Sequence, residues 1–532
     1  MVAAVALAAL AGGLFGPRLL ATEDEVEARY RVFTAALAAV ESQYVGPVES
    51  DRLVYSSING LLNTLDPHSS FFDPRSYAQM RERQEGHYYG LGITIQSIDG
   101  DILVGNVFEN SPAFRRGIRR GDTIAKIAGE SAKGWASDKA VSKLKGPKGT
   151  TVQVSIKRRG FDELIDLTVE RDEVSIPSLQ GHFMIDDRTG YIRLRDFSEV
   201  TDRDLGRALT DLQGKGMQRL VLDLRDNPGG PLDQAIRVSN RFLPLGDMIV
   251  YTRGRTRHSD EDYHAAEPAT VPALPMIVLV NRNSASASEI VSGALQDHDR
   301  ALVVGETTFG KALVQSLYRI AGEAGLALTT AHYFTPSGRM IQRPWDGTFD
   351  EYLSYSYRDQ EQPREHKSDQ LKKTDGGRTV YGGGGIEPDR RMVGPIEGFN
   401  PTRFGRLLHG RQVFADFAQR FSAQGDTRIT GGKDRRLVAR NFTVDDAMIE
   451  DFKGFVTNEA RIPMDAEGWT KDRAFITAMI RYEIDAALFS TEDARRHLVA
   501  YDPQAQYALS LFGEAESLTR LTASSRQAAR QP

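Results

Sequence analysis

The sequence predicts a multidomain α/β protein, and three observations lead to that prediction. The chain has 532 residues, which is enough for roughly three or four domains. Short apolar runs such as Met276 to Val280 have the length and composition of strands buried on both faces, and they alternate with segments whose apolar residues recur at helical spacing. Toward both ends of the chain the helical spacing dominates, so we expect helical regions to flank an α/β core.

The composition is that of an ordinary soluble globular protein, and it excludes several classes of function. Hydrophobic residues make up 40% of the chain and charged residues 26%, which are typical values. The net charge of -5 shows no basic bias, so nucleic acid is not an expected partner. The chain has no cysteine, which excludes disulfides, thiol catalysis and cysteine metal sites.

The first 21 residues predict a signal peptide or a membrane anchor. Residues 2–15 are almost wholly apolar, which is too short for a typical spanning helix and fits a signal-peptide core. The cleavage signal is poor because Leu19 stands where a small residue is wanted. An uncleaved anchor reaching Ala21 is therefore the other interpretation, and a buried N-terminal helix is a third. With either of the first two, the rest of the chain is exported. Residues 22–86 then form an expected helical region.

Serines gather where a predicted strand turns into a predicted helix. After Met276 to Val280 come serines at 284, 286 and 288, and then a helical apolar spacing from Ile290. A serine near a helix start is most often a cap, and Ser284 or Ser288 fits that role. The ends of strands in such sheets are also where functional sites collect.

A serine nucleophile needs a base, and Lys311 is the candidate in this stretch. The Gly-x-Ser-x-Gly elbow and the His-Glu-x-x-His helix are both absent. Lys311 follows a second short predicted strand, Ala301 to Gly305, through a Gly-Lys turn. A lysine acts as a base only when it is neutral, and an apolar environment can lower its pKa enough for that.

A glycine pair offers a second element of a catalytic site. A predicted strand over 219–224 ends in Asp226-Asn227-Pro228-Gly229-Gly230, just before a helical spacing that starts at Leu232. Glycines ahead of a helix present backbone N–H groups to an anion, and such groups form oxyanion holes. A dinucleotide-binding loop is not indicated because G-x-G-x-x-G is absent. A plain tight turn is the alternative.

The segment SASASEI at 284–290, followed by VVGETTFGKALVQ at 303–315, resembles the carboxy-terminal processing, or tail-specific, serine peptidases. The resemblance implies an α/β crotonase-like core at 173–395 that needs no metal or organic cofactor. FGKALVQ stands where FGKGTVQ is commoner in that family. The implied site consists of the nucleophile Ser286, the base Lys311 and Gln315, which orients the lysine. An oxyanion hole would come from Gly229 or Gly230, with Gly229 preferred, and from Ala287, while Glu289, Asp297 and Thr308 would support the dyad.

A glycine loop, Tyr89-Gly90-Leu91-Gly92-Ile93, opens a predicted strand, and the segment SPAFRRGIRRGDTIAKIAG follows at 111–129. With these two segments, residues 87–172 resemble a PDZ domain, and the second segment resembles the helix, turn and strand of that domain. The resemblance implies that the loop captures a C-terminal carboxylate while the peptide adds a strand to the sheet. The peptide-binding residues would be Tyr89, Gly90, Leu91, Gly92 and Ile93. The alternative is a β-rich domain in which the glycine loop is only structural.

Residues 396–532 lie beyond the resemblance and predict a helical domain. The spacing of Phe414, Phe417 and Phe421 indicates one amphipathic helix, and a second follows from Phe475. We expect Thr443 to cap a helix between them. The last residues, SSRQAARQP, have the composition of a disordered tail. The sequence leaves the domain's task open among an interdomain brace, an oligomer contact and a docking site.

Taken together, these features predict an exported serine endopeptidase of the bacterial periplasm or cell envelope. A Ser286–Lys311 dyad would cleave exported proteins, and the PDZ domain would select substrates with apolar C-terminal tails. An adaptor or activator protein and a homo-oligomer stay open. The alternatives are a non-catalytic PDZ scaffold and a ligand-binding protein on the same fold, and the complete Ser, Lys and Gln set favours the enzyme.

Overall fold

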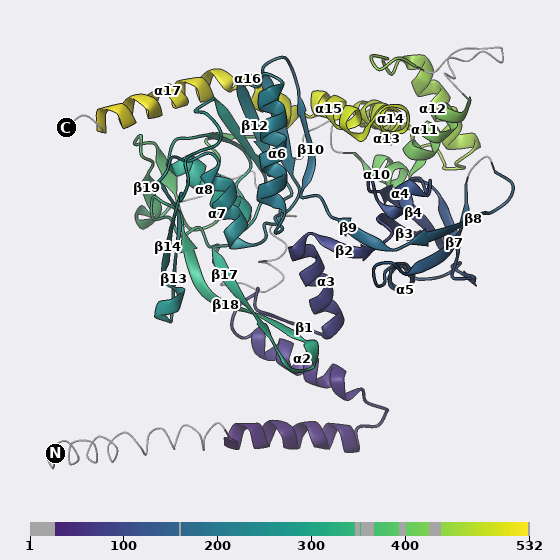
Figure 1. Cartoon of the computed structure of the whole chain (residues 1–532), viewed down its shortest axis with the longest axis horizontal. Helices are drawn as coiled ribbons and strands as arrows, with labels where there is room; N and C mark the ends of the chain where they lie inside the picture. Colours follow the sequence, from purple (N-terminus) through teal and green to yellow (C-terminus); the bar gives the residue numbers. More distant parts are fainter. Residues whose placement is uncertain are drawn as a thin grey trace. The chain divides into compact units, whose positions relative to one another are not determined.

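The computed structural model describes residues 27–158, 161–345, 352, 366–392, 401–424 and 438–529 (Figure 1). The predicted signal peptide or anchor lies outside these residues. The chain divides into two compact units, one of Met1–Tyr77 with Gln315–Thr329 and the other of Ala78–Val314 with Thr330–Pro532. Among the described residues, no helix is both long and apolar enough to cross a membrane.

The first unit is built from helices and a small antiparallel sheet. A helix spans 27–43, and α2 (Ser50–Leu62) follows. The strand β1 (Ser70–Phe72) pairs antiparallel with the start of β18 (Gly325–Phe334), and β17 (Leu313–Arg319) also pairs with β18. A short 3-10 turn, Ala321–Glu323, joins the last two strands. Leu62 and Phe71 belong to the small core of this unit.

The PDZ-like part of the second unit is a β-sheet that covers two short helices. After α3 (Pro74–Glu85), a five-strand path runs in the order β3-β4-β5-β7-β8, so β3 is an edge strand. A separate ribbon pairs β2 with β9. The elements are β2 (His87–Gly90), β3 (Ile93–Ile98), β4 (Asp101–Val107), α4 (Pro112–Arg115), β5 (Thr123–Ile127), β6 (Glu130–Ser131), α5 (Ser137–Leu144), β7 (Thr151–Lys157), β8 (Ile165–Glu170) and β9 (Asp172–Ser175).

A six-stranded sheet forms the centre of the second unit, in the order β10-β11-β12-β15-β16-β21. Only β10 runs antiparallel to its neighbour. The strands are β10 (Leu179–Met184), β11 (Thr189–Leu194), β12 (Arg219–Asp223), β15 (Met276–Val280), β16 (Leu302–Gly305) and β21 (Arg390–Arg391). The helices that follow its strands are α6 (Thr201–Gly214), α7 (Leu232–Asn240) and α8 (Ala287–Asp297).

The central strand β15 is buried on both faces, as its apolar sequence predicts. Met276, Val278 and Val280 belong to the core shared with α7 and α8. Ile277 and Leu279 point the other way, into a core formed with α16 (Pro503–Ser510) and α17 (Phe512–Ala529). Because strand side chains alternate between faces, helices must cover both sides of the sheet, and the C-terminal helices supply the second layer.

Further strands and hairpins surround this sheet. β13 (Met248–Gly254) pairs with β14 (Glu261–His264) and with the end of β18, and a 3-10 turn at Arg257–Ser259 joins β13 to β14. A 3-10 turn at Ser368–Gln370 leads into the hairpin β19 (Leu371–Lys373) and β20 (Thr379–Tyr381).

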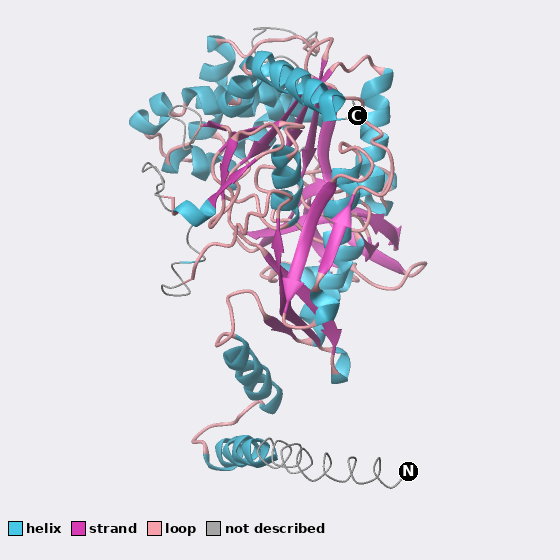
Figure 2. Ribbon diagram, turned by 90° about the vertical axis from the view of Figure 1, so that its left-hand side faces the viewer, coloured by secondary structure: helices cyan, strands magenta, loops and turns pink. Residues whose placement is uncertain are grey.

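The C-terminal part is helical, as predicted (Figure 2). It contains α10 (Arg403–Gly410), α11 (Val413–Gln424), α12 (Asp446–Asn458), α13 (Ala466–Lys471), α14 (Arg473–Leu488) and α15 (Thr491–Tyr501). Phenylalanines from α11 and α12 form the centre of its core, with Phe414 stacked on Phe452. The predicted multidomain α/β class with helical flanking regions is therefore confirmed.

Two local predictions in this region were wrong. The cap of α12 is Asp445, whose carboxylate accepts a hydrogen bond from the Met448 N–H at 3.0 Å, and not Thr443. The tail expected to be disordered is helical as far as Ala529, because α17 continues through it. Packing of Leu518 against the sheet stabilises this helix, a tertiary contribution that composition does not contain.

Candidate active site

Ser286 lies at the sharp turn between β15 and α8, in an unusual backbone conformation. It occupies the N-cap position of α8 with φ 54° and ψ −112°, a region that residues with a side chain seldom adopt. Its carbonyl accepts hydrogen bonds from the N–H of Glu289 at 2.8 Å and from the Tyr333 hydroxyl at 3.2 Å. Ser286 is half-buried, whereas its neighbours Ala285 and Ala287 are buried. The turn therefore leaves Ser286 more open to solvent than the residues on either side of it.

The two flanking serines hold this turn in place and do not cap the helix. The Ser284 hydroxyl donates to the Leu224 carbonyl at 2.8 Å, and the Ser288 hydroxyl donates to the Asn227 carbonyl at 3.0 Å. Both therefore connect the turn to the segment that follows β12. The expectation that one of them caps α8 was wrong, since Ser286 itself stands at that position.

Glu289 joins the serine turn to the turn that carries Lys311. Its Oε2 accepts the backbone N–H of Ser286 at 2.8 Å and that of Lys311 at 2.9 Å. Its Oε1 accepts the Gly310 N–H at 2.7 Å and the Thr308 hydroxyl at 2.5 Å. Because one oxygen accepts both amides, the nitrogens of Ser286 and Lys311 lie within about 6 Å of each other.

The ionised form of Glu289 fits this set of partners. Three of the four are N–H groups, which can only donate, and the fourth, the Thr308 hydroxyl, donates to Oε1 while its oxygen accepts the Ile386 N–H at 2.6 Å. Complete burial raises the pKa of Glu289, while the hydrogen bonds from Thr308, Lys311 and Gly310 oppose that effect. A buried carboxylate with four donors is a strong positional constraint.

The glycine pair after β12 packs directly against the serine turn. A Cβ on Gly229 would lie 2.6 Å from the Ala285 carbonyl oxygen and 2.9 Å from the Ser286 Cβ, and the φ of Gly229 is 92°. Only glycine fits there. The Gly229 N–H donates to Asn227 Oδ1 at 2.9 Å. Within the described residues, the N–H groups of Gly230 and Ala287 make no hydrogen bond.

Gln315 belongs to the first unit, whereas Ser286 and Lys311 belong to the second. Its Nε2 donates to the Thr329 hydroxyl at 3.2 Å. The Thr329 N–H in turn donates to the Ser69 hydroxyl at 3.1 Å, and that hydroxyl donates to Asp66 at 2.7 Å. Residues 66–70 thus contact β18, the strand whose Thr329 accepts the hydrogen bond from Gln315.

Asp297 lies at the opposite end of α8 from Ser286, about 15 Å along the helix axis. Its carboxylate pairs with Arg339, which is fully buried, and accepts the Ser337 hydroxyl at 2.7 Å. The expectation that Asp297 lies near the dyad was therefore wrong. Thr308, by contrast, contacts Glu289 directly.

The glycine loop of the PDZ-like part is closely packed. Gly92 has φ 82°, and a Cβ there would lie 2.2 Å from the Ser111 Cβ. Ser111 caps α4 by accepting the Phe114 N–H at 3.2 Å, and its hydroxyl donates to the Gly92 carbonyl at 3.3 Å. Tyr89 is exposed. Its neighbour Tyr88, which the sequence prediction left out, contacts the loop from the other side of β2.

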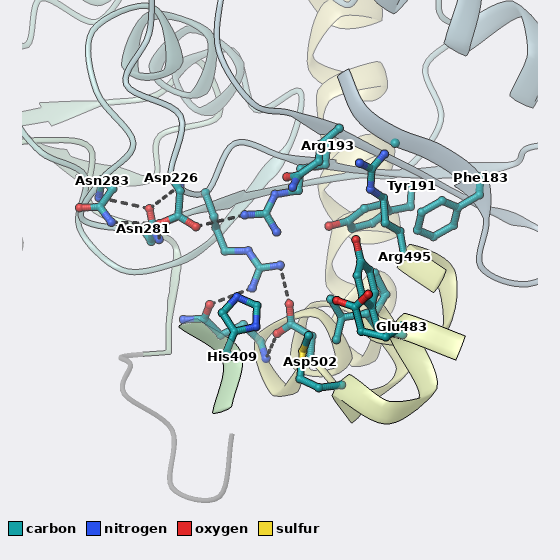
Figure 3. A pocket seen from close by; sticks show the side chains of 18 of the residues that line it. Phe183, Tyr191, Arg193, Asp226, Asn281, Asn283, His409, Glu483, Arg495 and Asp502 are labelled. Carbon is teal, nitrogen blue, oxygen red and sulfur yellow. Dashed lines mark hydrogen bonds and ion pairs between the residues drawn. The ribbon is translucent and has the colours of Figure 1, made fainter. Parts of the chain in front are cut away.

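A cavity of about 620 Å³ lies near the carboxyl ends of β12 and β15, without Ser286 or Lys311 in its lining (Figure 3). Its charged groups are mostly paired. Arg193 contacts Asp226 at 3.1 Å, and Arg225 contacts Asp502 of the C-terminal helices at 2.6 Å. The cavity therefore lies among paired charged side chains, one pair of which connects the end of β12 to the C-terminal helices. No group of three or more side chains able to hold a metal occurs in the described part of the chain.

Comparison with known proteins identifies two regions of the chain. The profile of peptidase family S41 matches residues 188–348, which include Ser286 and Lys311, and the PDZ domain profile matches residues 79–157. A carboxy-terminal-processing protease from Bartonella bacilliformis is 41% identical over 307 residues, covering 57% of this chain and 70% of that protein. The carboxy-terminal processing protease CtpA from Bacillus subtilis is 32% identical over 331 residues, covering 62% of this chain and 70% of that protein. The solved structure of a photosystem II D1 C-terminal processing protease is 26% identical, covers 67% of this chain and 86% of that chain, and superposes with a TM-score of 0.34.

Proposed function

The chain belongs to the carboxy-terminal processing proteases of peptidase family S41, and from that premise we propose that it is an endopeptidase with a Ser286–Lys311 dyad. The observation that carries the proposal is the shared contact with Glu289. One buried carboxylate holds the backbone of Ser286 and the backbone of Lys311 together. A purely structural serine would not need a lysine turn fixed beside it in this way.

The reaction is acyl transfer. The neutral amine of Lys311 takes the proton of the Ser286 hydroxyl as the oxygen attacks the scissile carbonyl carbon. Collapse of the tetrahedral intermediate releases the new amino terminus, with the proton passing from Lys311 to the leaving nitrogen, and leaves an acyl-enzyme. Water, deprotonated by Lys311, then hydrolyses the ester and restores Ser286. Gln315 would orient Lys311.

The oxyanion would be held by backbone N–H groups of the glycine turn and of the helix start. Ala287 is the first residue of α8, where the helix dipole favours negative charge. Gly230 is the better of the two glycine donors, since the Gly229 N–H already bonds to Asn227. Gly229 contributes by leaving the space for the turn to approach Ser286. Electrostatic stabilisation of this kind is usually a large part of such catalysis.

In this proposal the PDZ domain, residues 87–172, selects the substrates, and the catalytic domain, residues 173–395, cleaves them. The residues Tyr89 to Ile93 would bind the carboxylate of an apolar tail at the open edge of β3. The two relatives described above are bacterial, and the apolar run at 2–15 supports export to the periplasm or cell envelope. Fractionation of cells that produce the tagged full chain tests export directly.

The experiment compares the wild-type chain with Ser286→Ala on an unfolded protein substrate. Loss of fragments from the variant, with an unchanged circular dichroism spectrum, is expected. Ser524→Ala, an exposed serine on α17, is the matched control and should cleave normally. Full cleavage by Ser286→Ala would overturn the dyad. Absence of cleavage by the wild type, with retained binding of tails, would favour the non-catalytic scaffold.

A further inference from the structure

Tyr333 is a buried residue of β18 that contacts both turns of the candidate active site. Its hydroxyl donates to the Ser286 carbonyl at 3.2 Å, and its backbone N–H donates to the carbonyl of Ala312, the residue after Lys311, at 2.9 Å. Tyr333 is only 1% exposed. One residue of a strand therefore connects the serine turn with the lysine turn, in addition to the link that Glu289 provides.

The Tyr333 hydroxyl acts as the donor in this contact. A carbonyl oxygen can only accept, so the proton of the hydroxyl points to Ser286. Burial raises the pKa of Tyr333 well above its ordinary value, and the charge of Glu289 acts in the same direction. The phenol therefore keeps its proton, and the contact persists, throughout the pH range of a protease assay.

The carbonyl that Tyr333 holds belongs to the peptide unit that carries a proposed oxyanion donor. The Ser286 C=O and the Ala287 N–H share one planar trans peptide bond, so they point in opposite directions. The direction of this unit is set by the ψ of Ser286, which is −112°. The Ala287 N–H makes no hydrogen bond in the described part of the chain. A donor that fixes the carbonyl therefore also fixes the direction of an N–H that is open to a ligand.

The helix α8 supplies two more donors to the same carbonyl, and Tyr333 differs from them in its origin. The N–H groups of Glu289 and Ile290 donate to the Ser286 carbonyl at 2.8 Å and 3.0 Å. Both belong to the first turn of α8, so they move with the helix. The Tyr333 hydroxyl comes from β18 instead. Because the backbone of Ser286 lies in a region that is seldom adopted, a contact from outside the helix resists its relaxation.

We propose that Tyr333 is a positioning residue of the oxyanion hole. By holding the Ser286 carbonyl, it directs the Ala287 N–H toward the negative oxygen that forms when Ser286 attacks the scissile carbonyl. The hydrogen bond to the carbonyl also polarises the peptide unit, which strengthens its N–H as a donor. The inference rests on the proposed function of Ser286, and Tyr333 acts through the backbone without touching the substrate.

The effect of Tyr333 should appear in kcat and not in KM. The oxyanion exists in the transition state and is absent from the bound substrate, so a better-aimed donor stabilises only the former. Complete loss of one oxyanion donor lowers kcat by about 10²- to 10³-fold. Without the Tyr333 hydroxyl the Ala287 N–H is still present but is held less firmly, so the expected loss is smaller, about tenfold.

The test measures cleavage of one peptide substrate by the full chain and by Tyr333→Phe. The variant should fold, because the Ser286 carbonyl keeps its two donors from α8. We expect kcat to fall about tenfold and KM to stay within about twofold of the wild type. Tyr251→Phe is the matched control, since Tyr251 stacks on Phe334 and its hydroxyl makes no hydrogen bond to any described residue. Its kinetics should equal those of the wild type.

A pair of inhibitors separates the transition state from the ground state. In a peptide aldehyde the Ser286 oxygen adds to the aldehyde carbon, and the hydroxyl proton passes to the new hemiacetal oxygen, which occupies the oxyanion position. The matching peptide alcohol binds without this bond. Tyr333→Phe should bind the aldehyde about tenfold more weakly than the wild type and bind the alcohol equally well.

Two ring analogues at position 333 distinguish donation from packing. A para-amino group keeps a donor in place of the hydroxyl, whereas a para-fluorine fills the same space and cannot donate. We expect para-aminophenylalanine to keep kcat within about threefold of the wild type and para-fluorophenylalanine to lower it about tenfold.

The possible failures are separate. A wild-type kcat in folded Tyr333→Phe or in the fluorine analogue, or equal losses in the amino and fluorine analogues, would overturn the positioning role of Tyr333 while the dyad stands. Equal affinity of the wild type and Ser286→Ala for the aldehyde would show that Ser286 does not attack, and the proposed function would fall together with this inference.

Discussion

Replacing Glu289 with glutamine tests whether this carboxylate holds the proposed nucleophile Ser286 and the proposed base Lys311 in register. The substitution keeps the shape of the side chain but turns one acceptor into a donor. If the new NH₂ faces Ser286 and Lys311, two buried N–H groups lose their acceptor. If it faces Thr308 and Gly310, the Gly310 N–H loses its acceptor, while the hydroxyl can rotate to accept. The second orientation is the less costly.

The magnitude follows from that orientation. One unsatisfied buried donor costs about 1–3 kcal/mol, and the remaining hydrogen bonds lose their charge assistance. We therefore expect the free energy of unfolding to fall by about 2–4 kcal/mol, a large part of a typical total of about 5–15 kcal/mol. A shift of the serine turn of about 1 Å would lower kcat/KM by about a hundredfold.

The assay combines urea unfolding, followed by circular dichroism, with cleavage of one unfolded substrate at a temperature where the variant is folded. Glu467→Gln is the control, because Glu467 makes only an exposed helical pair with Lys471, which is worth about 0.5 kcal/mol or less. A folded Glu289→Gln enzyme with wild-type stability and activity within about twofold of wild type would refute the positioning role.

Two further predictions address the base and a buried histidine. Lys311→Arg keeps the positive charge, but a guanidinium has a pKa above about 12 and cannot accept a proton. The cleavage rate should therefore fall by about 10²- to 10⁴-fold. A folded variant that retains more than about a tenth of the wild-type activity would exclude Lys311 as the base. Burial lowers the pKa of His298, but hydrogen bonds to Asp375 and the Met248 carbonyl, together with the charge of Asp247, outweigh burial and raise it. The stability that His298 contributes is therefore complete below its unfolded pKa of about 6.5 and is lost as pH rises through the higher folded value. Urea unfolding at pH 6 and pH 9 should show this loss in the wild type and a smaller one in His298→Gln, and equal pH dependence in both would contradict the assignment.

The sequence contained enough to place the main elements of the catalytic part. An unbroken apolar strand followed by helical spacing predicts β15 and α8, because both patterns follow directly from burial. The family resemblance added Ser286, Lys311 and the glycine pair as candidates. Their catalytic roles remain proposals, while the hydrogen bonds to Glu289 describe how the backbones of Ser286 and Lys311 are held.

Other features could not be predicted because they depend on contacts between distant segments. Glu289 looks like an ordinary first-turn acid, and only the fold brings the Thr308 turn to it. The bond from the Gly229 N–H to Asn227 depends on turn dihedrals, which residue spacing does not define. Tyr88 has the pattern of a strand aromatic, and the position of its ring over Gly90 depends on the ribbon that β2 forms with β9.

The helix that carries Ser286 is fixed at both ends, and this explains how a strained residue can be held ready for reaction. All eleven residues of α8 are buried. At its start Glu289 accepts the Ser286 N–H, and its negative charge suits the positive end of the helix dipole. At its end His298 contacts acceptors through both ring nitrogens, so it is a cation, which suits the negative end. Because a shift at either end breaks charged hydrogen bonds, the energy that holds the φ of Ser286 at 54° comes from the packing of the whole helix. As the proposed nucleophile, Ser286 is therefore oriented before a substrate arrives.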